Sequence, residues 1–475
     1  MKTSPAILLV GMTLLAFCGG ATASSVAVTA DFSHPTGMTA GPYSYSLNAQ
    51  DAFDPSIAGT PGDPFYKANV ASMAAGMLRY SHADEMADSS AVQQFGDLTF
   101  SRGWVKDAAL PDCDWDETKI QNALNGSYTY GPERMIDIVN WPVCMADSTG
   151  SLDPTKYAAY ASFCAELVHI LNIDLKLHIR YFEVFNELDD NGGLYRGRMG
   201  IAAGIYNQAA AAMKAVDPTI KVGGPAFRQA YPTQDFDDFF AGAAANLDFV
   251  TFHAYAYCRA HKQAKTLAYL YDQAAAIGAK SAPWVENDFA GHSSGHPEFY
   301  LDEFNMNCDG PDERMTDIDG AVFDALTMIN AVNVGTSGIS AWNEADDRYG
   351  KIAGGTPYDR FPSSYLYQAF NDYMMGPVYQ STPGGNDRAI VPFAVKSNTS
   401  YLVALVGRGP TARKVRLTLS GIANLSSSTE LSVMQVNAGG LQTLPDVTYG
   451  VFSSSTGYSL PLNTITIVSL PVSGH

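Results

Sequence analysis

The chain has 475 residues, of which 46% are hydrophobic and 16% are charged. This composition is typical of a folded protein with a sizeable core and excludes a disordered chain. The formal net charge is -19, from 48 acidic and 29 basic residues. Nucleic acids and anionic membrane surfaces bind basic faces, so neither is an expected partner.

The first 23 residues predict a signal peptide. Lys2 supplies the positive start, residues 6–17 form an apolar segment, and residues 21–23 (Ala-Thr-Ala) form a small-residue cleavage site. No later segment has the roughly 18 uninterrupted apolar residues that a membrane span requires. We therefore expect a secreted or periplasmic protein that has no membrane partner after cleavage.

Residues 24–375 alternate short apolar segments with amphipathic helical stretches. The predicted strands cover residues 43–48, 77–81, 135–141, 180–187, 220–224, 247–254, 298–303 and 338–343. Helices are predicted between them, for example at 157–171, 201–216, 265–277 and 319–332. This alternation is typical of a parallel sheet, and eight strand–helix units favour an α/β fold of the closed (β/α)8 TIM-barrel type over a doubly wound sheet.

Residues 376–475 have a different pattern. Short β segments at 390–395, 400–406, 414–419, 430–435 and 464–470 are separated by Gly, Ser and Asn, and no helical pattern intervenes. This predicts a C-terminal antiparallel β-sandwich as an accessory domain. Residues 24–32 are candidates for an additional strand of that sandwich.

The six cysteines become five once the signal peptide is removed, so at least one lacks an intramolecular partner. Cys113 and Cys144 follow the second and third predicted strands, and Cys258 and Cys308 follow the sixth and seventh. Loops of neighbouring strands meet at one barrel face, so we expect Cys113–Cys144 and Cys258–Cys308 bridges. Cys164 lies in an apolar helix and is expected to be a buried thiol.

Two glutamates close predicted strands. Glu187 ends the strand at 180–187, and Glu303 ends the strand at 298–303. The C-terminal ends of barrel strands are where α/β barrels place their catalytic groups. Two carboxyl groups about 5–5.5 Å apart cleave a glycosidic bond with retention of configuration. We therefore predict Glu187 as the acid/base and Glu303 as the nucleophile. Asn186 is expected to form a hydrogen bond with the sugar 2-hydroxyl.

Two sequence motifs carry a family resemblance. Phe-Asn-Glu-Leu at 185–188, together with Leu-Asp-Glu-Phe-Asn at 301–305, resembles the clan GH-A retaining glycoside hydrolases. The segment Val-Asp-Pro-Thr-Ile-Lys-Val-Gly-Gly-Pro-Ala at 216–226 resembles family 39, the β-xylosidase and iduronidase relatives. The resemblance covers residues 40–375, and it implies the acid/base on strand four and the nucleophile on strand seven.

The same resemblance assigns roles to other strand ends. Arg79 matches the arginine that keeps the nucleophile ionised, the Tyr255 hydroxyl is expected to contact the nucleophile, and Trp342 matches an aromatic platform for a sugar ring. The substrate-binding candidates are Arg79, Asn140, Trp141, Asn186, His253, Tyr255 and Trp342.

Three further carboxylates compete for a role. Glu286 is the rival nucleophile, Glu344 is expected to contact substrate or a loop, and Glu183 is expected to point away from the cleft. Few basic residues fall near the predicted cleft, which disfavours an acidic sugar.

No metal or cofactor is expected. His292 and His296 are four apart, but Ser-Ser-Gly between them does not form a helix face for zinc, and the chain has neither a Gly-rich phosphate loop nor a serine nucleophile elbow. We therefore predict a secreted retaining glycoside hydrolase acting on a β-linked oligo- or polysaccharide. The alternatives are an inactive carbohydrate-binding barrel and a transglycosylase.

Overall fold

The computed structural model describes residues 25–49, 63–81, 104–106, 114–124, 133–190, 193–258, 265–310, 312–384, 388–409, 411–461 and 463–472. The predicted signal peptide lies outside the described residues. None of the described helices combines the length and the apolar character that crossing a membrane requires.

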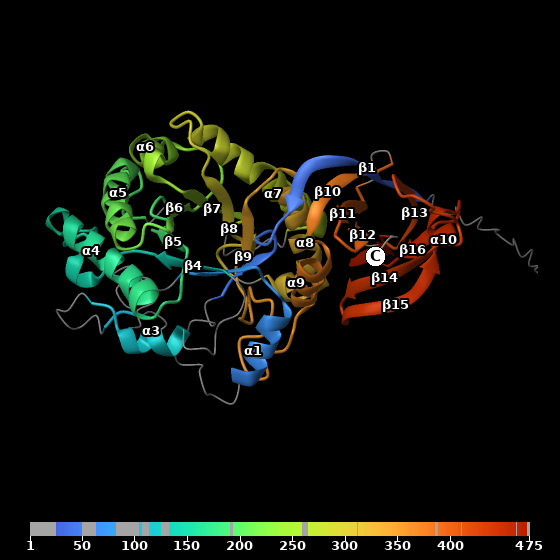
Figure 1. Ribbon diagram of the computed structural model, residues 1–475, viewed down its shortest axis with the longest axis horizontal. Helices are drawn as coiled ribbons and strands as arrows, with labels where there is room; N and C mark the ends of the chain where they lie inside the picture. The colour runs from blue at the N-terminus through green and yellow to red at the C-terminus, as the bar shows by residue number, and fades with distance from the viewer. Residues whose placement is uncertain are drawn as a thin grey trace, which may run out of the picture.

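Eight parallel strands close a barrel in chain order (Figure 1). They are β2 (Ser46–Asn48), β3 (Met77–Tyr80), β4 (Glu133–Ile138), β5 (Tyr181–Val184), β6 (Lys221–Phe227), β7 (Phe249–Tyr257), β8 (Glu298–Asn307) and β9 (Gly338–Ala341). Each overlaps one of the predicted strands, so the predicted barrel is confirmed.

Helices surround this barrel. Those of the described residues are α1 (Asp63–Ser72), α3 (Glu117–Leu124), α4 (Tyr157–Val168), α5 (Met199–Val216), α6 (Gln234–Ala243), α7 (Leu267–Phe289), α8 (Ile318–Asn333) and α9 (Pro362–Tyr373). A π-helical segment at His169–Asp174 extends α4. Helix α7 continues twelve residues beyond the predicted end at 277 and includes Pro283, because buried residues such as Val285 and Phe289 keep a helical spacing.

The barrel interior is filled in layers, because every second residue of a strand points inward. The layer at the start of the strands is apolar and packs together Met77, Met135, Tyr181, Phe249 and Tyr300. The layer two residues further along the same strands is polar and buried, and consists of Arg79, Asp137, Glu183, Thr251 and Asp302. The apolar layer closes the bottom of the barrel, and the polar layer forms the floor of the site.

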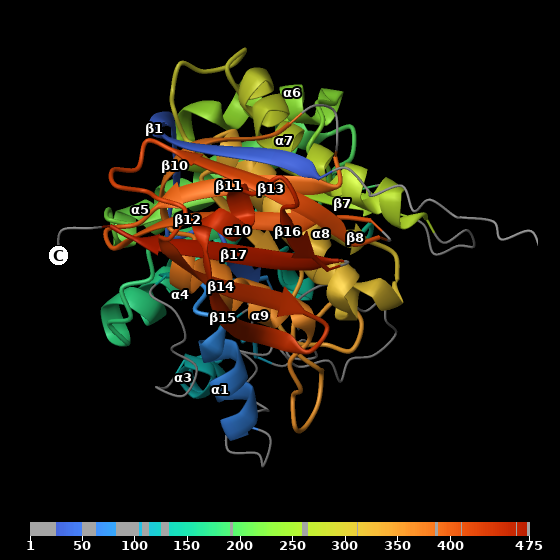
Figure 2. The ribbon, with the colours of Figure 1, turned by 90° about the vertical axis from the view of Figure 1, so that its right-hand side faces the viewer.

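A second sheet lies beside the barrel, as Figure 2 shows in front of it. Its strands are β1 (Val26–Ala40), β10 (Gly376–Pro383), β11 (Ile390–Lys396), β12 (Ser400–Gly407), β13 (Arg413–Ser420), β14 (Glu430–Asn437), β15 (Gly440–Thr448), β16 (Tyr458–Leu460) and β17 (Thr464–Pro471), with the short helix α10 (Tyr449–Ser453). The strand order is β15-β14-β17-β12-β11-β10-β1-β13-β16, and the N-terminal strand β1 pairs antiparallel with β10 and parallel with β13. The sheet has its own apolar core, so the predicted sandwich domain is confirmed.

The disulfide between Cys258 and Cys308 joins the residues that follow β7 and β8, with the two Cα atoms 4.9 Å apart. This predicted bridge is confirmed. Cys144 is also disulfide-bonded, whereas its predicted partner Cys113 lies outside the described residues. Cys164 is a buried thiol of α4, as predicted.

A buried ion pair joins α8 to the segment after β9. Lys351 Nζ lies 2.7 Å from Asp324 Oδ2, and each side chain is 1% exposed. Burial raises the pKa of Asp324, and the ammonium of Lys351 opposes that effect. The pair fixes the loop beside the barrel mouth to the helical layer.

Candidate active site

Arg79 is the centre of the polar layer. Its Nη1 donates to Glu303 Oε1 at 3.0 Å and to Asn48 Oδ1 at 2.9 Å. Its Nη2 donates to Asp137 Oδ2 at 3.1 Å, and its Nε to Glu183 Oε2 at 2.6 Å. The side chain is fully buried, so these carboxylates hold the pKa of Arg79 well above its usual range although burial alone would lower it. The arginine is therefore a permanent cation under the barrel mouth.

Glu303 reaches this cation because β8 carries an irregularity. On the β7 side Leu301 pairs with Phe252 and Glu303 with His253, so Asp302 is the extra residue. In a regular strand, two consecutive side chains point to opposite faces, and a bulge removes that alternation. Both Asp302 and Glu303 consequently contact Arg79, at 3.0 Å each.

Glu187 lies just beyond β5, where the backbone leaves the strand conformation. Phe185 and Glu187 have positive φ angles of 80° and 51°. Such angles are unfavourable for residues other than glycine, by roughly 1–3 kcal/mol each. Glu187 N–H donates to Ala226 O at 2.9 Å, which holds the turned segment against β6.

The Gly-Gly-Pro-Ala motif makes that close approach possible. A Cβ on Gly224, whose φ is +131°, would lie 2.5 Å from Val184 O. A Cβ on Gly223 would lie 2.4 Å from the Phe249 ring. Only glycine leaves room at these positions, so the motif seats β6 against the strand that delivers Glu187.

The two predicted catalytic carboxylates face each other across His253. His253 Nδ1 lies 2.6 Å from Glu187 Oε1 and 3.4 Å from Glu303 Oε2. One oxygen of each glutamate and one nitrogen of the histidine lie within 4.8 Å of one another. Glu303 is 8% exposed and Glu187 is 30% exposed, so Glu187 is the more accessible of the two. The separation fits a retaining pair of carboxyl groups.

Burial and charge set the ionisation of this cluster. Burial raises the pKa of Glu303, and the cations of His253 and Arg79 oppose it only in part. Burial would lower the pKa of His253, but Glu303 and Asp302 outweigh it and hold that pKa well above its usual range. Burial raises the pKa of Glu183 to about 8, and the cation of Arg79 opposes part of this rise. Tyr255 Oη donates to Glu303 Oε2 at 2.8 Å and thereby stabilises the carboxylate form.

Glu187, His253 and Glu303 could also offer one ligand atom each to a cation. Both oxygens of Glu303 already accept hydrogen bonds, from Arg79 and Tyr255. A metal ion would have to displace these donors and would lie close to the guanidinium charge. The donor set therefore suits an organic substrate better than a metal.

Several other predicted residues lie around this pair. Asn186 is partly exposed, and its Oδ1 accepts from Arg79 Nη2 at 2.9 Å. Trp342 follows β9 and is partly exposed, and its backbone N–H donates to Phe304 O at 3.1 Å, which joins this residue to the strand of Glu303. Asn140 is 8% exposed at the end of β4.

The prediction for Trp141 needs correction. Its side chain is 1% exposed, and its ring packs edge-on against Tyr160, Phe185 and Tyr195. Its indole N–H donates to Gly150 O at 3.1 Å. Trp141 is therefore part of the core behind Glu187 and cannot stack on a sugar.

The three competing carboxylates lie in different surroundings. Glu286 lies on the outer helix α7, away from the Arg79 cluster, so it is not a rival nucleophile. Glu344 is fully buried and accepts from Tyr66 Oη at 3.0 Å, so it does not contact substrate. Its backbone oxygen accepts from Lys351 N–H at 3.0 Å, which is the loop contact that was the other expectation. Glu183 points into the barrel at Arg79 instead of away from the cleft.

Sequence reasoning missed three buried acids of the site, namely Asp137, Glu183 and Asp302. Each lies within an apolar strand, where an acid is rarely buried without a partner. That feature of the sequence was sufficient to mark them as members of an ionic cluster.

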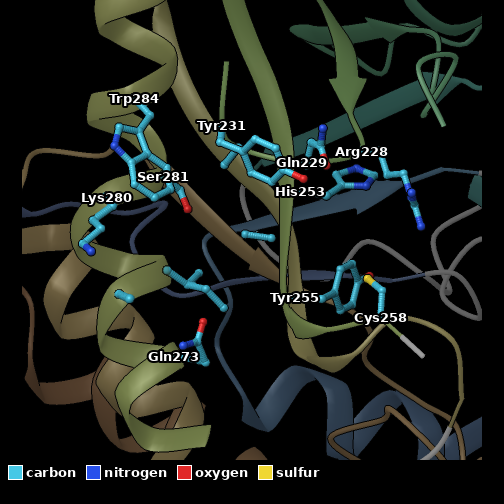
Figure 3. Close-up of a pocket in the computed structure, with 14 residues that line it drawn as sticks. Arg228, Gln229, Tyr231, His253, Tyr255, Cys258, Gln273, Lys280, Ser281 and Trp284 are labelled. Carbon is cyan, nitrogen blue, oxygen red and sulfur yellow. The ribbon is translucent and has the colours of Figure 1, made fainter. Parts of the chain in front are cut away.

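A pocket of about 680 Å³ lies between β7 and α7 (Figure 3). It is lined by the segment after β6, the end of β7 and one side of α7. Its lining includes His253 and Tyr255, which form hydrogen bonds with Glu187 and Glu303, respectively. Two residues of the pocket lining therefore contact the candidate catalytic pair.

Comparison with known proteins agrees with this geometry. The model of Glycosyl hydrolases family 39 matches residues 175–344, the part that contains both glutamates. The Beta-xylosidase of Caldicellulosiruptor saccharolyticus is 26% identical over 240 residues, 48% of this chain and 48% of the relative. The chain is most like family 39 of the clan GH-A glycoside hydrolases. The predicted resemblance is confirmed, although the alignment spans only about half of that relative.

Solved structures share the fold of this chain over nearly its whole length. A monomeric beta-xylosidase from Caulobacter crescentus CB15 has a TM-score of 0.66 at 16% identity, covering 94% of this chain and 100% of its own. An alpha-L-arabinofuranosidase from Thermotoga maritima has a TM-score of 0.66 at 12% identity, with the same coverage. A glucosidase from Croceicoccus marinus has a TM-score of 0.67 at 12% identity and covers 94% and 99%. At these identities, the likeness shows the fold alone.

Proposed function

We propose that this chain hydrolyses a β-linked oligo- or polysaccharide with retention of anomeric configuration. Glu187 is the acid/base and Glu303 the nucleophile. The observation that carries the proposal is the pair of carboxylate oxygens within 4.8 Å at the C-terminal ends of the strands. The Arg79 cation beside Glu303 fits a nucleophile that must be ionised. The greater exposure of Glu187 fits an acid/base that must reach the leaving group and water.

In the first step, a Glu303 oxygen attacks the anomeric carbon and the glycosidic bond breaks. Protonated Glu187 gives its proton to the leaving oxygen, so the leaving group departs as an alcohol. Hydrogen bonds from Arg79 and Tyr255 keep Glu303 ionised for this attack. The N–H of charged His253, 2.6 Å from Glu187, stabilises the carboxylate that proton donation leaves behind.

In the second step, water attacks the anomeric carbon of the glycosyl ester on Glu303. Glu187, now a carboxylate, accepts a proton from this water and returns to its acid form. The ester bond breaks and Glu303 is released as a carboxylate. Both substitutions invert the anomeric centre, so the product keeps the starting configuration.

The test uses three variants and two classes of aryl β-glycoside. Glu303→Gln should remove turnover of every substrate. Glu187→Gln should slow substrates with poor leaving groups by about 10²–10⁴-fold and spare those that need no proton, because general acid catalysis contributes about that much. Glu286→Gln, on the outer helix, is the matched control and should keep activity.

The anomer that is released first, followed by NMR, should have the configuration of the substrate. A first product of inverted configuration, or an active Glu303→Gln variant, would contradict the proposal. Binding of glycans without any turnover of a broad panel would favour an inactive carbohydrate-binding barrel. Oligosaccharide products formed with added acceptors would favour a transglycosylase.

We further propose that the protein is exported to act on this substrate outside the cytoplasm. The support is the N-terminal pattern at residues 1–23. Recovery of the mature protein with Ser24 as its N-terminus from the secreted fraction would support export, and retention of the full leader inside cells would contradict it.

A further inference from the structure

The pocket lined by His253 and Tyr255 has an unusual charge for this chain. The protein carries 48 acidic and 29 basic residues, yet the fourteen residues that line this pocket include Arg228, Lys280 and His253 and no Asp or Glu. The cations come from both walls, Lys280 from α7 and the other two from the opposite side (Figure 3). The few basic residues near the cleft are gathered here by the fold.

These cations differ in how far they are neutralised. Arg228 Nε lies 2.6 Å from Asp190 Oδ1, so its charge is partly balanced. Lys280 is exposed, and within the described part of the chain no carboxylate lies at ion-pair distance from its ammonium group. A ligand carboxylate could therefore pair with Lys280 without breaking an existing ion pair.

The same pocket displays two exposed aromatic rings. Tyr231 is 53% exposed and Trp284 is 42% exposed. Lys280 Nζ lies 5.8 Å from the centre of the Trp284 ring, one helical turn away on α7. An exposed indole offers a flat apolar face for a sugar ring, and the neighbouring ammonium offers a donor for a charge on that ring.

We propose that this pocket is a subsite for a hexuronic acid residue of the substrate, with Trp284 against the ring and Lys280 on the carboxylate. This proposal rests on the proposed function, because it assumes that the glycosidic bond is cleaved between Glu187 and Glu303. It narrows the substrate class to β-linked saccharides that carry an acidic unit beside the cleavage site. The sequence analysis disfavours an acidic sugar because few basic residues fall near the predicted cleft, whereas the fold brings Arg228 and Lys280 into one pocket.

The kinetic test compares two xylo-oligosaccharides that differ only in one substituent, a hexuronic acid or the corresponding neutral hexose. The wild type should favour the acidic substrate. Lys280→Gln should reduce the ratio of the two kcat/KM values about three- to tenfold, as expected for one partly exposed ion pair. Lys414→Gln, an exposed lysine of β13 in the sandwich, is the matched control and should keep the wild-type ratio.

Two further readouts separate charge recognition from general damage. Trp284→Ala should lower kcat/KM for both substrates and keep their ratio, because both sugars have a ring to stack. At about 1 M salt, where the Debye length falls to about 3 Å, the wild-type preference should shrink. An unchanged ratio in Lys280→Gln, or no wild-type preference at low salt, would overturn the subsite.

A binding measurement distinguishes failure of the subsite from failure of the hydrolase. Calorimetry of the two oligosaccharides is performed on Glu303→Gln and on Glu303→Gln with Lys280→Gln. A preference for the acidic ligand that is lost with Lys280 supports the subsite even when the unmodified protein turns over neither substrate. Turnover by the unmodified protein without a Lys280-dependent preference supports the hydrolase and rejects the subsite.

Discussion

Removing the hydrogen bond from Tyr255 to Glu303 is the most direct test of the proposed chemistry. Tyr255 Oη lies 2.8 Å from Glu303 Oε2, and Glu303 is 8% exposed. The hydroxyl donates to the carboxylate and thereby favours its ionised form. Tyr255→Phe removes this donor and keeps the ring, so the pKa of Glu303, already raised by burial, should rise further.

The size of the shift follows from the strength of the bond. A hydrogen bond to a charged group contributes about 1.5–3 kcal/mol, and one pKa unit corresponds to about 1.36 kcal/mol. Tyr255 is only partly buried, so water replaces part of the lost bond and the lower end of the range applies. We expect an upward shift of about one unit in the pKa of the nucleophile.

The assay is kcat/KM for an aryl β-glycoside between pH 4 and 9, because this parameter reports ionisations of the free enzyme. The acidic limb should move to higher pH, since Glu303 must lose its proton before it attacks. Tyr257→Phe is the matched control, because Tyr257 Oη makes a 2.8 Å bond to Asp312, outside the cluster. An acidic limb that stays in place, or moves to lower pH, in Tyr255→Phe would refute the role assigned to Glu303.

Three further substitutions test the scaffold. Glu183→Gln should flatten the pH dependence of the unfolding free energy measured in urea. A carboxyl whose pKa is raised to about 8 in the folded protein contributes its full stabilisation below its unfolded-state pKa, and this stabilisation is lost as the pH rises through 8. A variant with the wild-type pH profile would contradict this prediction. Lys351→Met should lower the unfolding free energy by about 3–5 kcal/mol, because it leaves the buried carboxylate of Asp324 unpaired. Lys106→Met removes an exposed ion pair and should lower the unfolding free energy by less than about 1 kcal/mol. Equal losses in the two variants would contradict this prediction. Gly224→Ala should lower kcat/KM strongly, because the added methyl group would collide with Val184 O on the strand that leads to Glu187. Gly37→Ala is the matched control, since Gly37 also has a positive φ but open space around it, and should leave kcat/KM unchanged. A fully active Gly224→Ala variant would contradict the predicted steric constraint.

Local patterns in the chain were sufficient for the architecture and for the candidate pair. The alternation of apolar strands and amphipathic helices predicted all strands of the barrel, because burial of one face imposes a period that can be read without neighbours. Glu187 and Glu303 were identified because each ends such a strand, and a barrel brings all its strand ends to one rim. The Cys258–Cys308 bridge followed from the same rule.

The tertiary structure alone decided which way several side chains point. The irregularity in β8 turns both Asp302 and Glu303 toward Arg79, and it arises from pairing with β7, which no local pattern encodes. Trp141 lies three residues beyond the end of β4 instead of ending the strand, and the packing of α4 and the segment after β5 covers it. Lys280 and Trp284 belong to a helix that the sequence pattern ended too early, and only the closed barrel brings this helix beside His253. Periodicity is a property of neighbouring residues, whereas strand register and the contacts between elements depend on residues that are distant in the chain.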